Sequence, residues 1–160
     1  MEIVKTAFEY KKYNGLGELS EDDKALVIEA IAQLPKAYAP YSNFHVGAAV
    51  RLKDNSIYVG SNQENAAYPL CMCGERVALY SAAAIKPDVA PVTLAITIQN
   101  QKVKITTPAS PCGACRQVIA EYAQRHQQKI RILLKADSDE IYEIDSIDDI
   151  LPLGFNGTFL

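Results

Sequence analysis

Two short stretches of this chain, Cys73-Gly74-Glu75 and Pro111-Cys112-Gly113-Ala114-Cys115, together hold three thiols and one carboxylate. Zinc binds thiolate sulfur readily, and a catalytic zinc has three protein ligands and one open position. The two cysteines of the second stretch are three residues apart, so they share one face if they lie on a helix. The cysteine of the first stretch would complete the set, and its glutamate would stand beside a metal-activated water without binding the metal. We therefore predict a zinc site with an acid–base group next to it, in a fold that brings the two stretches together.

Both stretches lead into helical patterns. Residues 74–85 are apolar on nearly every side after Arg76, which predicts a buried central helix. Residues two apart point in different directions in a helix, so Cys73 and Glu75 can share a site only if Cys73 lies at the helix entrance. A second helix is expected to begin near Pro111, because proline is favoured in the first turn. The positive ends of both helices, together with Arg76, would balance the negative charge of three thiolates.

Strands and one further helix account for most of the remaining chain. Ser20 is a good N-cap for a helix whose apolar stripe ends at Leu34. Alternating apolar residues predict strands, and the short connection between the last two leaves no room for a crossover, so that pair should be antiparallel. The pattern predicts an α/β domain with a mixed sheet of about five strands. The expected strands cover residues 44–52, 57–60, 92–98, 130–134 and 141–144.

Residues 1–19 are expected to form an N-terminal extension. Apolar residues alternate with charged or small ones from Val4 to Tyr10, which predicts an edge strand. Two glycines then interrupt the chain. The full length of 160 residues suits one domain with a sizeable core, so we assign residues 20–160 to a single domain.

Composition excludes several classes of protein. Hydrophobic residues make up 49% of the chain and charged residues 22%, which is typical of globular domains. The net charge is -3 and no run of Lys or Arg occurs, which argues against a nucleic-acid partner. No apolar run reaches the roughly 20 residues of a membrane helix, so no membrane partner is expected. The first residues lack the basic-then-apolar order of a signal peptide, so we expect a cytoplasmic protein whose four cysteines serve metal or redox chemistry.

Three other interpretations of the cysteines remain open at this point, one of which is that the four cysteines are inert. Cys71 supplies a fourth sulfur, so the chain could hold a structural zinc site with four cysteine ligands. Cys112 and Cys115 could instead form a thioredoxin-like redox pair. The structural zinc site leaves Glu75 and the polar stretch at residues 62–64 unexplained.

Four blocks of the sequence resemble the free-nucleoside cytidine deaminases. The pattern Cys-x-Glu followed by Pro-Cys-x-x-Cys is typical of zinc deaminases. The likeness runs in order from about residue 21 to residue 156 and does not cover the first 20 residues. One position departs from the family, which commonly has Ala where Gly74 stands, and we expect reduced rigidity there and the same reaction. The blocks are Tyr38-Ala39-Pro40-Tyr41-Ser42-Asn43-Phe44, Asn62-Gln63-Glu64-Asn65-Ala66-Ala67-Tyr68, Cys73-Gly74-Glu75-Arg76 and Ser110-Pro111-Cys112-Gly113-Ala114-Cys115-Arg116-Gln117.

The resemblance implies a three-layer α/β/α fold and a zinc-dependent hydrolysis. Cytidine and deoxycytidine would become uridine and deoxyuridine with release of ammonia, as in pyrimidine salvage. Cys73, Cys112 and Cys115 would hold one zinc ion per chain, and Glu75 would carry protons from the attacking water to the base and to the departing ammonia. The implied substrate-binding residues are Phe44 on the base, Asn62 and Glu64 on the ribose 3′-hydroxyl, the Gly74 N–H and the Ser110 carbonyl on the pyrimidine edge, and also Ala66, Tyr68 and Phe155.

The resemblance also implies a homotetramer whose active sites are completed by neighbouring chains. Phe155 in the tail resembles the aromatic residue that reaches a neighbour's base pocket. Two alternatives to this function remain: a deaminase of a related base such as the nucleoside antibiotic blasticidin S, and a non-catalytic, four-cysteine zinc domain that binds a partner. Glu75 discriminates against the second alternative, because a structural zinc site has no use for it.

Overall fold

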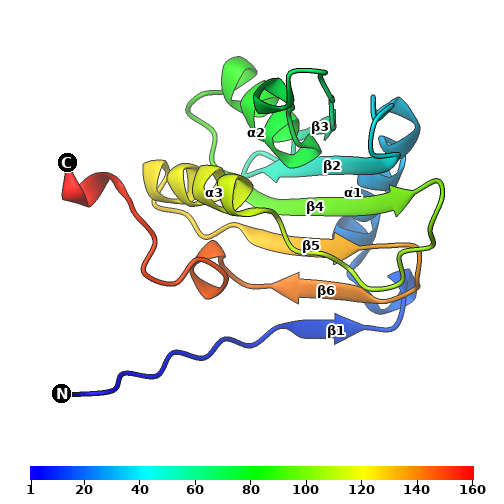
Figure 1. The fold of residues 1–160 in the computed structure, drawn as a ribbon. Coiled ribbons are helices and arrows are strands. Elements are labelled where there is room, and N and C mark those ends of the chain that lie inside the picture. The colour runs from blue at the N-terminus through cyan, green and yellow to red at the C-terminus, as the bar shows by residue number, and fades with distance from the viewer.

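Six strands form one mixed sheet in the computed structural model, which describes residues 1–160 (Figure 1). Their order across the sheet is β1-β6-β5-β4-β2-β3, and β4–β5 is the one parallel pair. The expected mixed sheet is confirmed, with six strands in place of about five. The strands are β1 (Lys11–Tyr13), β2 (Phe44–Leu52), β3 (Ile57–Ser61), β4 (Pro91–Asn100), β5 (Arg131–Lys135) and β6 (Ile141–Ile144).

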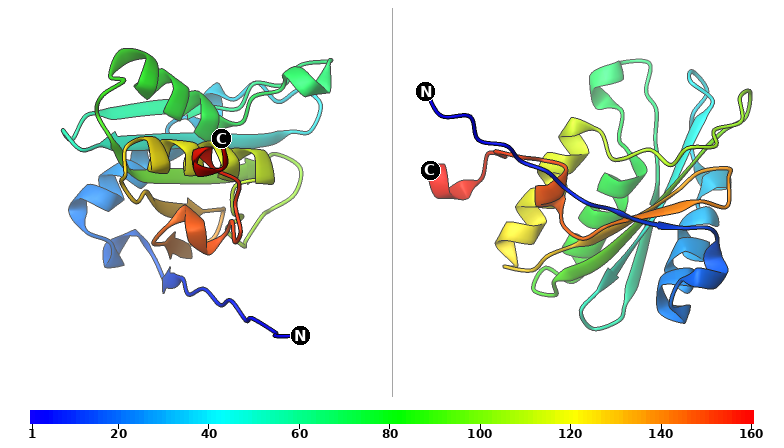
Figure 2. Two further views of the ribbon diagram at one scale, coloured as in Figure 1. Left: turned by 90° about the vertical axis from the view of Figure 1, so that its left-hand side faces the viewer. Right: turned by 90° about the horizontal axis from the view of Figure 1, so that it is seen from below.

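Helices cover both faces of the sheet, which confirms the three-layer α/β/α arrangement. Helix α1 (Glu21–Ile31) lies on one face, and α2 (Gly74–Ile85) and α3 (Gly113–Arg125) lie together on the other (Figure 2). Because β4 and β5 are parallel, the chain must cross over between them, and α3 makes this crossover. None of the helices is long and apolar enough to cross a membrane.

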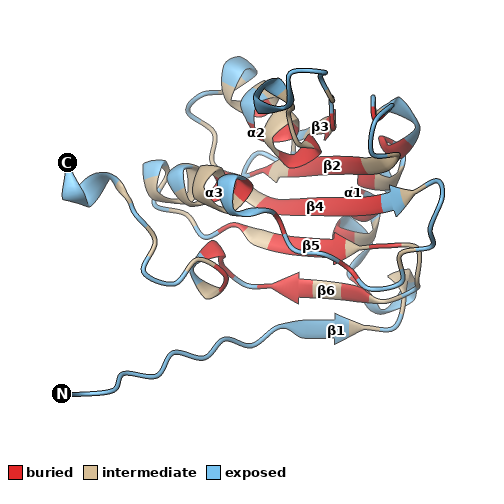
Figure 3. Ribbon diagram, viewed as in Figure 1, coloured by how far each residue is buried: buried red, intermediate tan, exposed pale blue.

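The sheet separates two hydrophobic cores. The larger core lies between the sheet and helices α2 and α3, and the smaller one lies between the sheet and α1. The central strands are buried along most of their length (Figure 3). Because both faces of β4 are covered, the small residues that alternate with its large apolar ones, Thr93, Ala95 and Thr97, are buried as well.

Helix α1 begins where the sequence predicted. The Ser20 side chain caps it by accepting a hydrogen bond from the Asp23 backbone N–H at 3.2 Å. The Asp23 carboxylate is buried and accepts hydrogen bonds from Arg51 and Arg131, both at 2.8 Å. Burial by itself would raise the pKa of Asp23, but the two guanidinium groups outweigh it and hold the pKa below its usual value. This buried ion network ties α1 to strands β2 and β5.

The N-terminal segment does form an edge strand, but not where the alternation predicted it. The strand covers Lys11–Tyr13 and pairs antiparallel with β6, whereas residues 4–10 form no strand and are exposed. The reason lies in the partner strand, which ends at Ile144 because Ser146 caps a turn there. Continuing the register places Tyr10 opposite Ile144, the last residue of β6, so the residues before Tyr10 have no partner strand and extend away from the sheet (Figure 1).

The contact between β2 and α1 yields a stability prediction. A Cβ atom on Gly47 would lie 2.1 Å from the Ala30 carbonyl oxygen, a backbone atom that cannot move independently of the helix. We therefore expect Gly47→Ala to lower the free energy of unfolding by about 1–3 kcal/mol or more, as overpacking does. Urea denaturation of both proteins measures this change.

Gly17→Ala is the matched control, because a Cβ atom there meets nothing within 4 Å. We expect its stability to stay within about 0.5 kcal/mol of the parent, as for most surface substitutions. An equal, small effect of the two alanines would contradict the close packing of α1 on β2.

Candidate metal centre and adjoining pocket

Three thiols converge where the N-termini of α2 and α3 meet. Cys73 is the N-cap of α2, Cys112 is the N-cap of α3, and Cys115 lies in the first turn of α3. The three sulfur atoms all lie within 4.8 Å of one another, and Sγ of Cys112 is 3.4 Å from Sγ of Cys115. Zinc–sulfur bonds of about 2.3 Å in a tetrahedron place sulfur atoms about 3.8 Å apart. The cluster therefore fits a zinc ion held by three thiolates, with a fourth position left open.

The surroundings of the cluster favour the thiolate of Cys73, whereas the hydrogen bond with Cys73 and burial raise the pKa of Cys115. Both helices direct their positive ends at the sulfur atoms, as the sequence predicted for Cys73 at the helix entrance. The pKa of Cys73 is lowered to about 5, first by the hydrogen bond with Cys115 and then by Arg76. The Arg76 guanidinium lies 3.9 Å from Sγ of Cys73 and also donates to the Cys71 carbonyl at 3.3 Å. Arg76 thus occupies the position expected of a group that balances the charge of the thiolates.

Glu75 lies beside the thiols and is almost fully buried, with 4% of its surface exposed. Its Oε2 atom is buried and has no hydrogen-bond partner. Burial raises the pKa of this carboxyl group, and the neighbouring Cys73 raises it further. Buried carboxylate oxygens are rarely left without a partner, so the atom indicates a group that binds here from outside the chain.

A cavity of about 240 Å³ adjoins the thiols and Glu75. This volume is below the roughly 300–1,000 Å³ of typical ligand pockets and suits a small ring. Four larger hollows lie elsewhere on the molecule, but none of them is lined by the thiols or Glu75. The cavity is lined by Phe44, Val46, Cys73, Glu75, Ile96, Ile98, Ala109, Ser110, Pro111 and Cys112.

Both expected sugar-binding residues, Asn62 and Glu64, make hydrogen bonds to segments next to this cavity. The Asn62 side chain accepts from the Val46 N–H and donates to the Phe44 carbonyl, both at 2.8 Å, so it fixes the start of β2. The Glu64 carboxylate accepts from the Tyr41 N–H at 2.9 Å and from the backbone and hydroxyl groups of Ser42. One of the two amide hydrogens of Asn62 makes no hydrogen bond within the chain. The Glu64 carboxylate has about four acceptor sites and accepts three hydrogen bonds, so one site stays free. Each side chain thus keeps one free position for a hydroxyl group.

Gly74 is buried at the start of α2, against strand β2. A Cβ atom at this position would lie 2.9 Å from the Val46 carbonyl oxygen. Glycine therefore allows α2 to approach β2 closely, which gives the departure from the expected alanine a packing reason.

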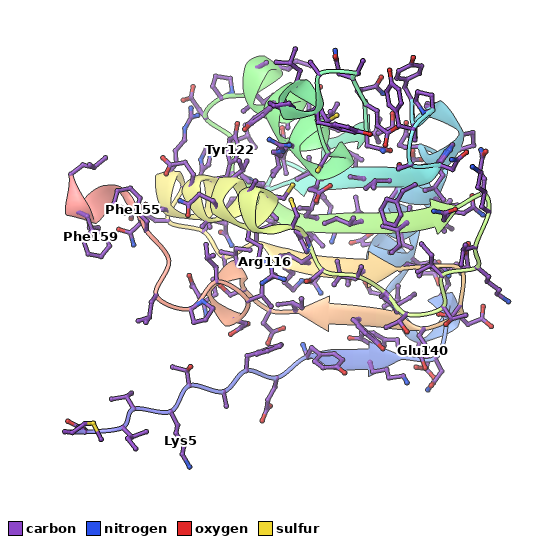
Figure 4. All side chains as sticks on the ribbon, viewed as in Figure 1. Lys5, Arg116, Tyr122, Glu140, Phe155 and Phe159 are labelled. Carbon is purple, nitrogen blue, oxygen red and sulfur yellow. The ribbon has the colours of Figure 1, made fainter.

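Only Phe44 and Ser110 of the eight expected substrate-binding residues line the cavity; besides Asn62, Glu64 and Gly74, the residues outside it are Ala66, Tyr68 and Phe155. Ala66 is exposed on the loop before α2, and the exposed Tyr68 packs edge-on against Tyr41 with ring centroids 6.1 Å apart. Phe155 is 57% exposed and stacks on Phe159 in the tail, beyond α3 (Figure 4). The chain therefore does not bring Ala66, Tyr68 or Phe155 into its own pocket.

Sequence reasoning gave no role to Ser42 and Arg116, which both touch the site. The Ser42 hydroxyl donates to Glu64 and accepts from the Phe44 N–H at 3.0 Å. The Arg116 guanidinium donates to Ser110 and to the Pro111 carbonyl. Both residues belong to the blocks that carry the resemblance. Their position in the sequence, close to expected site residues, could have suggested a role at the site.

Cys71 does not belong to the cluster. Its thiol instead contacts the backbone of Asn65, accepting from the N–H at 3.2 Å and donating to the carbonyl at 3.6 Å. The sulfur atoms that meet at one point are those of the other three cysteines. The geometry thus disfavours a structural site with four cysteine ligands.

Comparisons with known proteins agree on one family. Residues 20–128 match the family model described as the cytidine and deoxycytidylate deaminase zinc-binding region. A cytidine deaminase from Halalkalibacterium halodurans is 39% identical over 135 residues, covering 84% of this chain and 94% of that protein. One from Sporosarcina psychrophila is 37% identical over 136 residues, covering 84% and 92%. The crystal structure of cytidine deaminase from Burkholderia pseudomallei matches with a TM-score of 0.71 and 39% identity, covering 82% of this chain and 97% of that one.

The position of Cys71 outside the cluster yields a prediction about metal content. Cys71→Ser should keep about one zinc per chain, because three protein ligands suffice for an open site. Cys73→Ser is the matched comparison, two residues away, and should lose most of its zinc. Metal analysis of the purified variants measures both. Loss of zinc from Cys71→Ser would favour the four-cysteine site.

Proposed function

Because this chain belongs to the cytidine and deoxycytidylate deaminase family, we propose that its three-thiol centre serves the zinc-dependent deamination of cytidine and deoxycytidine. The enzyme is a hydrolase of the C–N bonds of cyclic amidines: it adds water to cytidine and releases uridine and ammonia. The observation that carries the proposal is the buried Glu75 carboxylate, whose unpartnered oxygen lies beside the three thiols and lines the cavity. Neither a structural zinc domain nor a blasticidin S deaminase is favoured by the family comparison.

Each group at the site has a role in this reaction. Zinc held by Cys73, Cys112 and Cys115, one ion per chain, supplies Lewis-acid activation of the attacking water. Glu75 takes one proton of that water and delivers it to N3 of the base, where it remains in uridine. As the C4–N4 bond breaks, Glu75 transfers the second proton to the departing amino group, which leaves as ammonia. The water oxygen becomes the C4 carbonyl oxygen, so Glu75 is the one group that must serve two successive proton transfers.

The remaining pocket residues are proposed to bind the nucleoside. Phe44 packs on the pyrimidine ring, while the Gly74 N–H and the Ser110 carbonyl contact the edge of the base. Asn62 and Glu64 hold the ribose 3′-hydroxyl, and the free hydrogen and the free acceptor site on these two side chains support this role. Arg76 balances the charge of the thiolates, and Ala66 and Tyr68 complete the substrate-binding set from the loop before α2.

We also propose a homotetramer in which Phe155 reaches the pocket of a neighbouring chain. The support is its exposure outside its own pocket, next to the exposed Phe159 and Leu160. A role in pyrimidine salvage is proposed from the substrate, and a cytoplasmic location is proposed with it. We propose an extension over residues 1–19 and one deaminase domain over residues 20–160; the family model, which covers residues 20–128, supports the start of that domain.

The assembly has a direct test. Light scattering should give a mass of about 70 kDa, four times the 17.6 kDa of one chain.

Phe155→Ala should raise the KM for cytidine about tenfold, because an aromatic ring then no longer closes the neighbour's pocket. Ile28→Ala is the control, because it truncates an exposed apolar side chain on α1, on the opposite face of the sheet from α3, and its KM should stay close to the parent value. A fully active monomer would end the tetramer proposal.

Glu75→Gln tests the mechanism. The amide keeps the size of the side chain but cannot accept and return protons, whereas the three thiolates remain to hold the metal. We expect a folded, zinc-loaded protein with at least about a thousandfold lower cytidine turnover, near the top of the range for acid–base groups. Metal analysis and uridine formation are measured on the same sample.

Glu121→Gln, a change of the same kind on the exposed side of α3, should keep the parent turnover. If zinc-loaded Glu75→Gln deaminates cytidine within about tenfold of the parent, Glu75 is not the proton shuttle, since that loss is below any expected acid–base contribution.

A further inference from the structure

One wall of the cavity is a loop without backbone–backbone hydrogen bonds. Ala109, Ser110 and Pro111 line the cavity, and they belong to a connection with no regular secondary structure. No backbone–backbone hydrogen bond involves residues 106–111. Buried prolines at 108 and 111 pack this segment against the molecule, but packing by itself does not orient a carbonyl group.

The Arg116 side chain supplies the missing hydrogen bonds. Its Nε atom donates to the Pro111 carbonyl at 2.8 Å, and its Nη2 atom donates to the Ser110 hydroxyl at 2.6 Å. These are the only hydrogen bonds within the protein that residues 106–111 make. The polar contacts of this wall therefore all come from one guanidinium group.

The same guanidinium is fixed at its other end. Its Nη1 atom donates to the Ile150 carbonyl at 2.7 Å, and Ile150 is buried in the larger core. Figure 4 shows Arg116 below α3, close to the turn that follows β6. A guanidinium is planar and rigid, so three bonds in different directions define its position, and with it the position of the segment it holds.

We propose that Arg116 is a positioning residue that sets where the Ser110 carbonyl meets the pyrimidine edge. Arg116 acts through Ser110 and Pro111 and is not itself among the residues that line the cavity. The inference rests on the proposed function, because it assumes that a pyrimidine occupies this cavity. A contact to the base edge is present in the bound substrate as well as in the transition state, so its loss raises KM more than it lowers kcat.

Two substitutions test this role. Arg116→Gln removes the guanidinium group and its three hydrogen bonds. We expect the KM for cytidine to rise about 10- to 100-fold, as for the loss of hydrogen bonds from a charged group. Turnover at saturating cytidine should stay within about fivefold of the parent, since the proton shuttle is untouched. Arg116→Lys keeps the charge but offers a single point donor, so its KM should fall between those of the parent and Arg116→Gln. Zinc content should equal that of the parent in both.

Arg125→Gln is the matched control. Arg125 lies at the other end of α3 and also donates to a proline carbonyl, that of Pro87, at 3.1 Å. That contact lies away from the cavity, so KM should not change. A double-mutant cycle with Ser110→Ala adds a second readout: if Arg116 acts through Ser110, the two losses should not add.

Three results would overturn the inference. One is a KM for both Arg116 variants within about twofold of the parent, which is less than the loss of one such hydrogen bond. Another is loss of zinc from both variants, which would assign Arg116 to the metal centre. The third is an equal rise in KM for Arg125→Gln. A zinc-loaded parent protein that does not deaminate cytidine would instead refute the proposed function, and is seen before any variant is compared.

Discussion

The close approach of α2 to strands β2 and β3 is the constraint on which the site depends. A Cβ atom on Gly60 would lie 2.5 Å from the backbone of α2, and one on Gly74 would lie 2.9 Å from the Val46 carbonyl oxygen. Two glycines thus let the helix lie directly on the sheet, with no side chain between them at these points. This contact fixes the start of α2, and hence Cys73 and Glu75, against the cavity wall formed by β2 and β4.

Electrostatics at the site follow from the same geometry. Zinc with three thiolates carries a net negative charge, which weakens its power to acidify water. The positive ends of α2 and α3 and the Arg76 guanidinium all lie at the cluster and offset that charge. Burial acts in the opposite direction on Glu75 and raises its pKa, so the pKa shifts of Cys73 and Glu75 have opposite signs. The lowered pKa of Cys73 favours the thiolate that a metal binds, and the raised pKa of Glu75 suits a carboxyl group that moves protons.

Sequence patterns predicted the features that depend on short-range periodicity. The helix entrance at Cys73, the Ser20 cap and the antiparallel β5–β6 pair were all confirmed. The first strand was misplaced because its extent depends on where β6 ends, more than a hundred residues away. The Asp23 ion network and the Arg116 bridge to Ile150 also join distant segments, and no local pattern carries such contacts. The motif predicted which three cysteines meet. The hydrogen-bond partners of Asn62 and Glu64 within the chain were visible only in the structure.

The dependence of cytidine turnover on zinc occupancy tests the central claim most directly. The metal is removed from the parent protein and returned in steps, while zinc per chain and the conversion of cytidine to uridine are measured on each sample. The account predicts no turnover without the metal, followed by a linear recovery that ends at about one zinc per chain, since one open three-thiolate site holds one ion. Full turnover by the metal-free protein, or a zinc-loaded protein with no turnover, would contradict it.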